Sequence, residues 1–235
     1  MNVLPQITSL GGAALDLVFP RFCVGCGKAG NYICGTCRAS LPYIEPPVCP
    51  LCGEPQTTGN LCFKCSQWQA DIDGIRAPFR FDGIIREAVH QLKYDNLRAI
   101  AASLAKLMAE YIEQHPIPVD ILIPVPLHPK RLRERGYNQS ALLARHIGKI
   151  TGLPVDETSL VREIYILPQA RTASVEARRA NVSGGFACLN DKMKDKKILL
   201  IDDVSTSGAT LNACAAALKA GGTNSVWGLS LAKEI

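Results

Sequence analysis

Two adjacent carboxylates and a small, hydroxyl-rich loop follow a run of four aliphatic residues near the end of the chain. Residues 198–201 are Ile-Leu-Leu-Ile, and Asp202 and Asp203 come directly after them. Carboxylates accept hydrogen bonds from sugar hydroxyls, and free N–H groups at the start of a helix attract phosphate. The combination is therefore suited to a sugar phosphate. The loop residues that would hold the phosphate are Thr206, Ser207, Gly208, Ala209 and Thr210.

The elements around this segment place it at the edge of a sheet. A run of four aliphatic residues is typical of a strand buried on both faces in a parallel sheet, and ligands bind at the carboxyl ends of such strands. Residues 211–220 are rich in Ala and Leu and end at Gly221 and Gly222, which predicts a packed helix after the loop. The loop lacks the Gly-Lys-Ser/Thr ending of a Walker A motif, which argues against a nucleoside triphosphatase.

Residues 198–210 resemble the phosphoribosyl pyrophosphate (PRPP) signature of type I phosphoribosyltransferases, which has an aliphatic run, two acids and a loop of Thr, Ser and Gly. The resemblance implies that Asp202 and Asp203 are the catalytic pair and hold the ribose hydroxyls. It also implies that residues 206–210 hold the 5-phosphate of PRPP bound with Mg²⁺. The alternative is a core strand whose acids only cap the next helix.

Four Cys-x-x-Cys pairs near the start of the chain provide a second kind of chemistry. Eight thiolates are enough for two tetrahedral zinc sites. Gly27 and Gly53 follow the second cysteine of the first and third pairs, which marks these two as the opening knuckles. Consecutive pairing is then expected, although interleaved pairing stays open. The consecutive sets are Cys23, Cys26, Cys34 and Cys37 for one zinc, and Cys49, Cys52, Cys62 and Cys65 for the other.

A disulfide framework is the rival explanation for these cysteines, and it needs an oxidising compartment. Residues 1–22 lack a basic start, and their apolar run is interrupted by Asp16 and ended by Pro20. Neither a secretory signal nor a membrane span fits this pattern, so a cytoplasmic chain with reduced thiols is expected. Cys188 and Cys214 lie in apolar strand and helix patterns and are expected to be buried free thiols.

A basic segment follows the predicted strand at residues 121–125 and is therefore expected as a loop at the same sheet edge. Residues 124–139 contain three prolines and four basic side chains against a single acid, Glu134. Concentrated positive charge beside a phosphate site suits a diphosphate leaving group, and a solvated basic turn is the alternative. The PRPP-binding arginines expected here are Arg131, Arg133 and Arg135.

Composition divides the chain of 235 residues near residues 66–73. The first part is rich in Cys, Pro and Gly and would depend on metal for its fold, whereas strands and helices alternate in the second part. We expect a helical leader at 1–22, a double zinc ribbon at 23–68 and an α/β domain at 73–235 with a mostly parallel sheet flanked by helices. The expected elements are strands at 76–81, 121–125 and 226–231, and helices at 84–94, 97–112 and 137–150.

The order of these features is similar to that of the ComF family (ComFC/GntX-like), over nearly the whole chain. The shared features are a cysteine-rich ribbon, Pro-Val-Pro followed by Arg-Gly-Tyr-Asn-Gln, and the PRPP signature. The resemblance implies a type I phosphoribosyltransferase-like fold in which a mobile loop closes over the site. Residues 162–168 are more apolar than expected for the family. The loop candidates to reach the diphosphate are Arg171, Arg178 and Arg179.

The resemblance implies transfer of a phosphoribosyl group to an unidentified acceptor, of which a nucleobase is one candidate, in DNA uptake or nucleotide metabolism. One alternative is a non-catalytic protein of natural transformation that senses PRPP or handles single-stranded DNA. Another is an adaptor whose ribbon recruits a partner, such as a protein of the competence machinery, and whose PRPP site is vestigial. The net charge of +5 is only a weak indication of nucleic-acid binding. Phe63 and Trp68 are candidates to stack on a base, although packing on the core is the simpler role.

Overall fold

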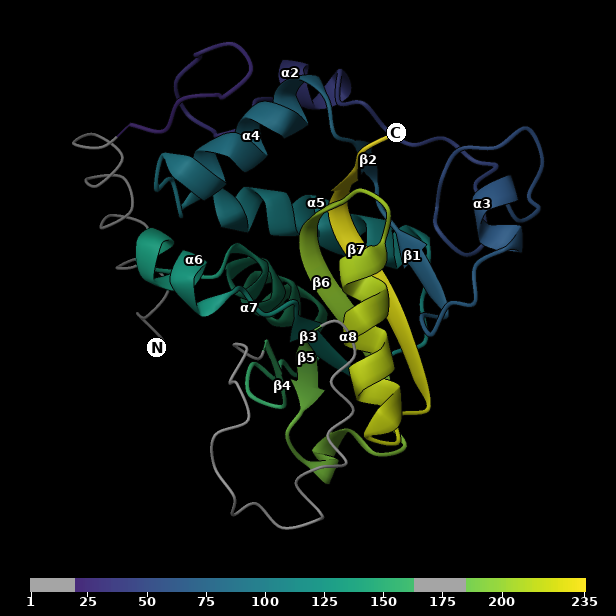
Figure 1. Cartoon of the computed structure of the whole chain (residues 1–235). Helices are drawn as coiled ribbons and strands as arrows, with labels where there is room; N and C mark the ends of the chain where they lie inside the picture. The colour runs from purple at the N-terminus through teal and green to yellow at the C-terminus, as the bar shows by residue number, and fades with distance from the viewer. Residues whose placement is uncertain (1–19, 163–184) are drawn as a thin grey trace, which may run out of the picture.

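A five-stranded sheet in which every pairing is parallel forms the centre of the molecule. The computed structural model describes residues 20–162 and 185–235. The strand order is β3 (Ile121–Pro124), β6 (Lys197–Ser205), β7 (Ser225–Lys233) and β1 (Gly74–Arg76), and β2 (Phe79–Arg80) also pairs with β7 (Figure 1). The predicted fold class, a mostly parallel sheet flanked by helices behind a cysteine-rich module, is confirmed.

Helices cover both faces of the sheet. α8 (Ala209–Ala220) lies on one face, and α5 (Ile100–Gln114) and α7 (Gln139–Thr151) lie on the other, with α4 (Gly83–Tyr94) beside α5 (Figure 1). The helices predicted at 84–94, 97–112 and 137–150 are therefore present, with ends shifted by at most three residues. The molecule thus has the three layers typical of an α/β domain.

The aliphatic run at 198–201 lies in β6, which is buried on both faces as the sequence predicts. Leu199 and Ile201 belong to the apolar cluster that contains α5 and α7, whereas Ile198 and Leu200 belong to the cluster that contains α8. All four side chains are fully buried. Alternation along this central strand therefore presents successive residues to opposite helix layers.

The basic segment is the main correction to the predicted elements. The sequence predicts a loop, and the structure shows a short helix, α6 (Pro129–Arg135). Pro129 occupies the first helical turn, His128 accepts a hydrogen bond from the Lys130 N–H (3.2 Å), and Gly136 ends the helix with φ of +76°. Proline at the start and glycine at the end are the normal boundaries of a helix.

The expected strand at 76–81 is a second, smaller difference. Two short strands, β1 and β2, stand in its place, and Ala77 and Pro78 separate them. Proline lacks the N–H that a continuous strand would use, so the pairing with β7 is interrupted there. Outside the sheet, β4 (Leu160–Arg162) pairs antiparallel with β5 (Phe186–Cys188).

The second half of the cysteine-rich module packs against the β1 edge of the sheet, and the first half packs on α4 and α5. The module contains two short helices, α2 (Gly35–Ala39) and α3 (Phe63–Ser66). The Ile75 N–H of β1 donates to the Leu51 carbonyl (2.6 Å), which ties the second half of the module to this strand. A Cβ at Gly53 would lie 2.6 Å from the Ile75 carbonyl oxygen, so the close approach requires glycine there.

Some expectations fall on residues outside the described ranges. They are residues 1–19 of the leader expected at 1–22, and the loop candidates Arg171, Arg178 and Arg179. Within the described ranges, none of the helices has the length and apolar character needed to cross a bilayer.

Candidate functional site

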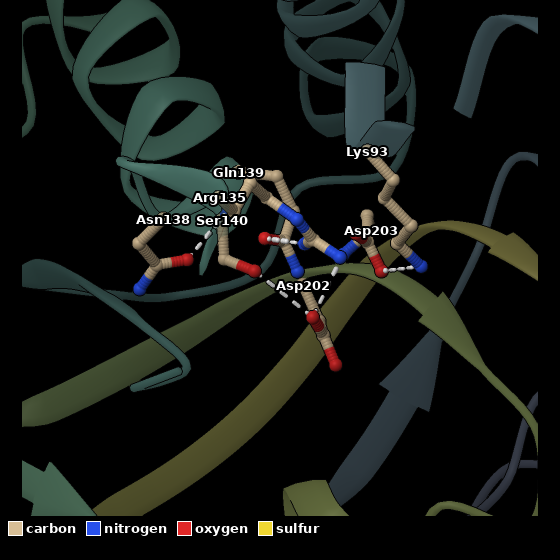
Figure 2. Close-up of polar contacts among 7 residues, drawn as sticks. All are labelled: Lys93, Arg135, Asn138, Gln139, Ser140, Asp202 and Asp203. Carbon is tan, nitrogen blue, oxygen red and sulfur yellow. Dashed lines mark hydrogen bonds and ion pairs between the residues drawn. The ribbon is translucent and has the colours of Figure 1, made fainter. Parts of the chain in front are cut away.

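The two acidic residues lie near the carboxyl end of β6. Asp203 is only 3% exposed, and its Oδ1 accepts a hydrogen bond from Lys93 Nζ of α4 at 2.8 Å (Figure 2). The other oxygen, Oδ2, is buried and has no partner among the described residues. Because a buried carboxylate oxygen without a partner is costly, Oδ2 is an unsatisfied hydrogen-bond acceptor at this position.

Asp202 points to the opposite side of the strand and is partly exposed. Its Oδ1 accepts hydrogen bonds from Ser140 Oγ, at the start of α7, and from the Asp203 N–H, both at 2.9 Å. Asn138 caps α7 by accepting from the Ser140 N–H at 3.0 Å, which fixes the serine (Figure 2). Burial raises the pKa of Asp202 to about 7, and the neighbouring charge of Asp203 adds to this effect.

The loop between β6 and α8 has the geometry of an anion site. Gly208 has φ of +80° and precedes the first residue of α8, where no side chain caps the helix. A Cβ at this position would lie 2.5 Å from Ile75 Cδ1, so only glycine fits. Lys233 Nζ, at the end of β7, donates to the Thr206 carbonyl at 3.1 Å and holds the loop in place. Ser207 Oγ accepts from the Ala209 N–H at 3.4 Å, and the other N–H groups in the first turn of α8 suit an anion.

A basic cavity of about 540 Å³ lies between the end of α4 and α6. Lys93 lines this cavity as well as pairing with Asp203, so the cavity is adjacent to the acid pair. Two of the arginines are held over aromatic rings: Arg98 over Tyr137 at 4.4 Å, and Arg135 over Tyr94 at 5.5 Å. The lining has four cations and one acid, and consists of Lys93, Tyr94, Asn96, Arg98, Arg131, Glu134, Arg135 and Tyr137.

The cysteines form two clusters of four, in the consecutive arrangement. The sulfur atoms within each cluster lie within 4.8 Å of one another. The Cys34 N–H donates to Cys23 Sγ at 3.3 Å, and the Cys62 N–H donates to Cys49 Sγ at 3.5 Å. We call Cys23, Cys26, Cys34 and Cys37 the first cluster, and Cys49, Cys52, Cys62 and Cys65 the second cluster.

The electrostatics of these clusters fit zinc. Burial acts to raise the pKa of Cys23, but N–H groups of the knuckle outweigh it and lower the pKa to about 6; the same balance lowers the pKa of Cys49 to about 6. Contact with Cys23 and burial raise the pKa of Cys37 to about 12, because thiolates so close repel one another. A divalent cation removes this repulsion, and tetrahedral sites with four cysteine ligands are typical of structural zinc. Two structural zinc sites are thus supported.

Comparison with known proteins agrees with this description of the ribbon. The double zinc ribbon domain family matches residues 14–66. The chain is 27% identical to competence protein ComFC of Bacillus subtilis, over 81% of this chain and 79% of that protein. It is 28% identical to competence protein F of Haemophilus influenzae, over 87% and 92% respectively. The chain is thus similar to two competence proteins over most of its length. It is also 26% identical to DNA utilization protein YhgH of Escherichia coli, over 76% of this chain and 80% of that protein.

Solved structures similar to this chain include an amidotransferase and a phosphoribosyltransferase. One is glutamine PRPP amidotransferase from B. subtilis, with a TM-score of 0.40 and 18% identity, over 56% of this chain and 26% of that chain. The other is purine phosphoribosyltransferase from Pyrococcus horikoshii, with a TM-score of 0.35 and 17% identity, over 57% and 72% respectively. The chain thus spans about a quarter of the amidotransferase.

Most of the site residues expected from the sequence come together in the structure. Asp202, Asp203 and the loop 206–210 meet at one sheet edge, and Arg131 and Arg135 line the basic cavity beside them. Arg133 is exposed and does not line that cavity.

Sequence reasoning missed Lys93, Arg98 and Ser140. Lys93 is the penultimate residue of a helix whose apolar spacing was recognised, and Ser140 follows the Asn-Gln pair of a recognised motif. Polar residues near the ends of the recognised helices could therefore have been named as candidate site residues.

Proposed function

We propose that this protein binds PRPP and transfers its phosphoribosyl group to an acceptor, with release of pyrophosphate. The observation that carries the proposal is the buried Oδ2 of Asp203, which has no partner in the described part of the chain. The other oxygen of this carboxylate pairs with Lys93, which lines the basic cavity, and β6 leads from Asp203 to the loop before α8. Sugar hydroxyls need such an acceptor, and the phosphates at the two ends of PRPP need the two anion sites. We place the activity in the cytoplasm, where cysteine-rich sites of this kind stay reduced.

Each part of PRPP has matching groups in this arrangement. Asp202 and Asp203 would accept hydrogen bonds from the ribose hydroxyls, and the N–H groups of residues 206–210 would hold the 5-phosphate. Lys93 and the cavity arginines would neutralise the diphosphate. Mg²⁺ prefers oxygen ligands such as these carboxylates and the phosphates, and when bound it would share the neutralisation of the leaving group.

The reaction needs positioning and charge neutralisation more than covalent catalysis. The bond between ribose C1 and the diphosphate oxygen breaks, and the diphosphate leaves with the electron pair. The acceptor forms the new bond to C1 with its lone pair and loses a proton to solvent. The protein holds the sugar at both ends and stabilises the charge that develops on the leaving group.

A non-catalytic role in DNA handling is the second candidate. The relatives are named competence proteins and a DNA utilization protein, which favours a link to DNA uptake. In that case PRPP binding would report on nucleotide supply, and single-stranded DNA or a competence protein would be the partner. Pyrophosphate release separates the two roles. Release of pyrophosphate from PRPP in the presence of a candidate base supports transfer. Binding of PRPP with no pyrophosphate release, whichever base or DNA is added, supports the accessory role.

Calorimetric titration of PRPP with Mg²⁺ tests the shared part of both roles. We expect saturable binding to the wild type, weaker binding of ribose 5-phosphate, and loss of both in Asp203→Asn. Asp195→Asn is the matched control, because Asp195 is exposed and lies away from the site with φ of +59°, which asparagine tolerates. Absence of PRPP binding to the folded wild type would reject the proposal.

A further inference from the structure

Tyr137 lies between the end of α4 and the start of α7. In the sequence it stands between Gly136, which ends α6, and Asn138, which caps α7. Its side chain is only 7% exposed, and its hydroxyl donates a hydrogen bond to the Leu92 carbonyl of α4, 45 positions away in the sequence. Burial raises the pKa of Tyr137, so the hydroxyl stays protonated and acts as a donor at neutral pH.

The Leu92 carbonyl is a group that the end of a helix leaves without a regular partner. α4 ends at Tyr94, so this carbonyl is one of the last four of the helix. The chain turns away from the helix at Asn96, which has φ of +56°. Because a buried carbonyl without a donor is costly, the tyrosine hydroxyl stabilises the last turn of α4 in its position beside α7.

The aromatic ring of Tyr137 holds the segment that follows α4. The Arg98 guanidinium lies over this ring at 4.4 Å, and Arg98 Nε donates to Asn96 Oδ1 at 2.9 Å. The hydroxyl therefore holds the last turn of the helix, and the ring holds the turn after it. One side chain thus fixes the carboxyl end of α4 through two separate contacts.

Lys93 is the neighbour of Leu92 in the turn that Tyr137 fixes. Its Nζ lies 2.8 Å from Asp203 Oδ1 (Figure 2), and it lines the basic cavity. A lysine side chain is flexible, so the place of its ammonium group depends on where the helix holds its backbone. A shift of the last turn of α4 would therefore move the cation away from both the acid and the cavity.

We propose that Tyr137 is a positioning residue, whose hydroxyl holds Lys93 between Asp203 and the diphosphate of PRPP. The inference rests on the proposed function, because only a ligand in the basic cavity would bring a diphosphate to Lys93. The hydroxyl acts through the Leu92 carbonyl and needs no contact with the ligand.

Tyr137→Phe tests the proposal, because it removes the hydroxyl and keeps the ring under Arg98. We expect PRPP affinity, measured by calorimetry with Mg²⁺, to fall by about fivefold, and ribose 5-phosphate affinity by less than about twofold. Tyr111→Phe is the matched control: it makes the same change at a partly buried tyrosine of α5 that does not line the basic cavity. Equal PRPP affinities in the two variants would overturn the proposal.

A double-mutant cycle with Lys93→Met shows whether the hydroxyl acts through the lysine. In the Lys93→Met background, Tyr137→Phe should cause no further loss of PRPP affinity, because the cation that it positions is already gone. A hydroxyl that contacts the ligand directly, or that supports the fold in general, would cause the same fivefold loss in both backgrounds. That result would overturn the assignment of Tyr137 as a positioning residue.

The same cycle, measured by urea denaturation, gives a readout that needs no ligand. The losses in the free energy of unfolding should be less than additive, because both changes disturb the pair of Lys93 and Asp203. Additive losses would contradict the proposal. If the wild type binds PRPP and Tyr137→Phe binds it equally well, only this inference is wrong. If the folded wild type does not bind PRPP, the proposed function is wrong, and the urea cycle still decides whether Tyr137 positions Lys93.

Discussion

Lys93 and Asp203 form a largely buried ion pair that connects the acid pair to the basic cavity. Lys93→Met removes the charge and leaves a buried carboxylate without a cation. We predict a loss on the order of 3 kcal/mol in the free energy of unfolding, measured by urea denaturation. PRPP affinity should also fall by about tenfold, and more than that of ribose 5-phosphate, because Lys93 would face the diphosphate.

Two further variants make the Lys93 result specific. Lys93→Arg keeps the charge and should recover most of the PRPP affinity. Lys106→Met removes an exposed lysine of α5 and should change neither stability nor binding by a measurable amount. If Lys93→Met and Lys106→Met bind PRPP equally well, the proposed contact with the diphosphate is wrong.

The raised pKa of Asp202 makes a prediction about pH. Burial, with the charge of Asp203, raises this pKa from 3.8 to about 7, so the carboxyl is protonated in the free protein below pH 7. A ribose hydroxyl is better bound by the ionised form, and binding at pH 6.5 should therefore release a proton. Affinity should rise between pH 6 and 7, by at most about tenfold, and then level off.

Calorimetry at pH 6.5, in two buffers with different heats of ionisation, measures the proton release directly. Asp202→Asn should abolish the proton release that comes from the protein. Equal proton release in this variant would show that the phosphates of PRPP, and not Asp202, account for the pH dependence.

The residue-level chemistry was predictable only where it was contiguous in the sequence. The pair Asp202-Asp203 and the loop after it form one uninterrupted segment, so their types and order were enough. Ser140 reaches Asp202 from 62 positions away, and Lys93 reaches Asp203 from α4, in the first half of the chain. Such partners follow from tertiary packing, which a local pattern does not specify.

At the scale of the elements, α6 separates three arginines that look equivalent in the sequence. Arg131 and Arg135 are one helical turn apart and both line the basic cavity, whereas Arg133 lies between them and outside it. We predict that Arg131→Ala or Arg135→Ala weakens PRPP by about tenfold in calorimetry, with ribose 5-phosphate affected much less.

Arg133→Ala is the matched control on the same helix. It removes the same side chain from an exposed position and should weaken PRPP by less than about twofold, through long-range charge alone. Equal losses in all three variants would mean that the net charge of α6, and not the cavity, attracts the ligand.

Periodic apolar residues predicted the long helices α4, α5 and α7, whereas the short helix α6 lacks such residues and was not predicted. α4, α5 and α7 each bury a stripe of apolar side chains, and this spacing is visible in the sequence. α6 buries none of its residues, so no stripe marks it. Pro129 and Gly136 are typical of the start and end of a helix and could have predicted α6, but the three prolines between residues 124 and 129 favoured a loop.

For the whole molecule, the two metal clusters make a prediction about composition and stability. Elemental analysis should find about two zinc ions per chain. Cys65→Ser should lose one of them and, because the second cluster packs on Trp68, should also lower the thermal stability. Cys188→Ser is the control: this thiol is partly buried and lies outside both clusters, so the zinc content should stay the same as in the wild type.

The arrangement of the two parts of the chain was less predictable than their existence. Composition separated a cysteine-rich part from an α/β part, because metal sites and apolar cores need different residues. Nothing in the composition indicated that the Leu51 carbonyl would accept a hydrogen bond from the Ile75 N–H of β1, or that Trp68 would lie against Gly208. These contacts join the ribbon to the loop, and they depend on the fold of both parts together.

The pairing of β1 with β7 has a consequence for the order in which the protein can fold during its synthesis. Gly74 lies opposite Trp227, so 227 − 74 = 153 residues separate the two partners. At roughly 5–20 residues per second, β1 waits about 8–30 s for its partner to be made. Both cysteine clusters are complete by Cys65 and can take up metal while the ribosome is still making the sheet. A message that ends before residue 225 would therefore give a complete ribbon attached to a chain without β7, the strand that joins β1 and β2 to β6.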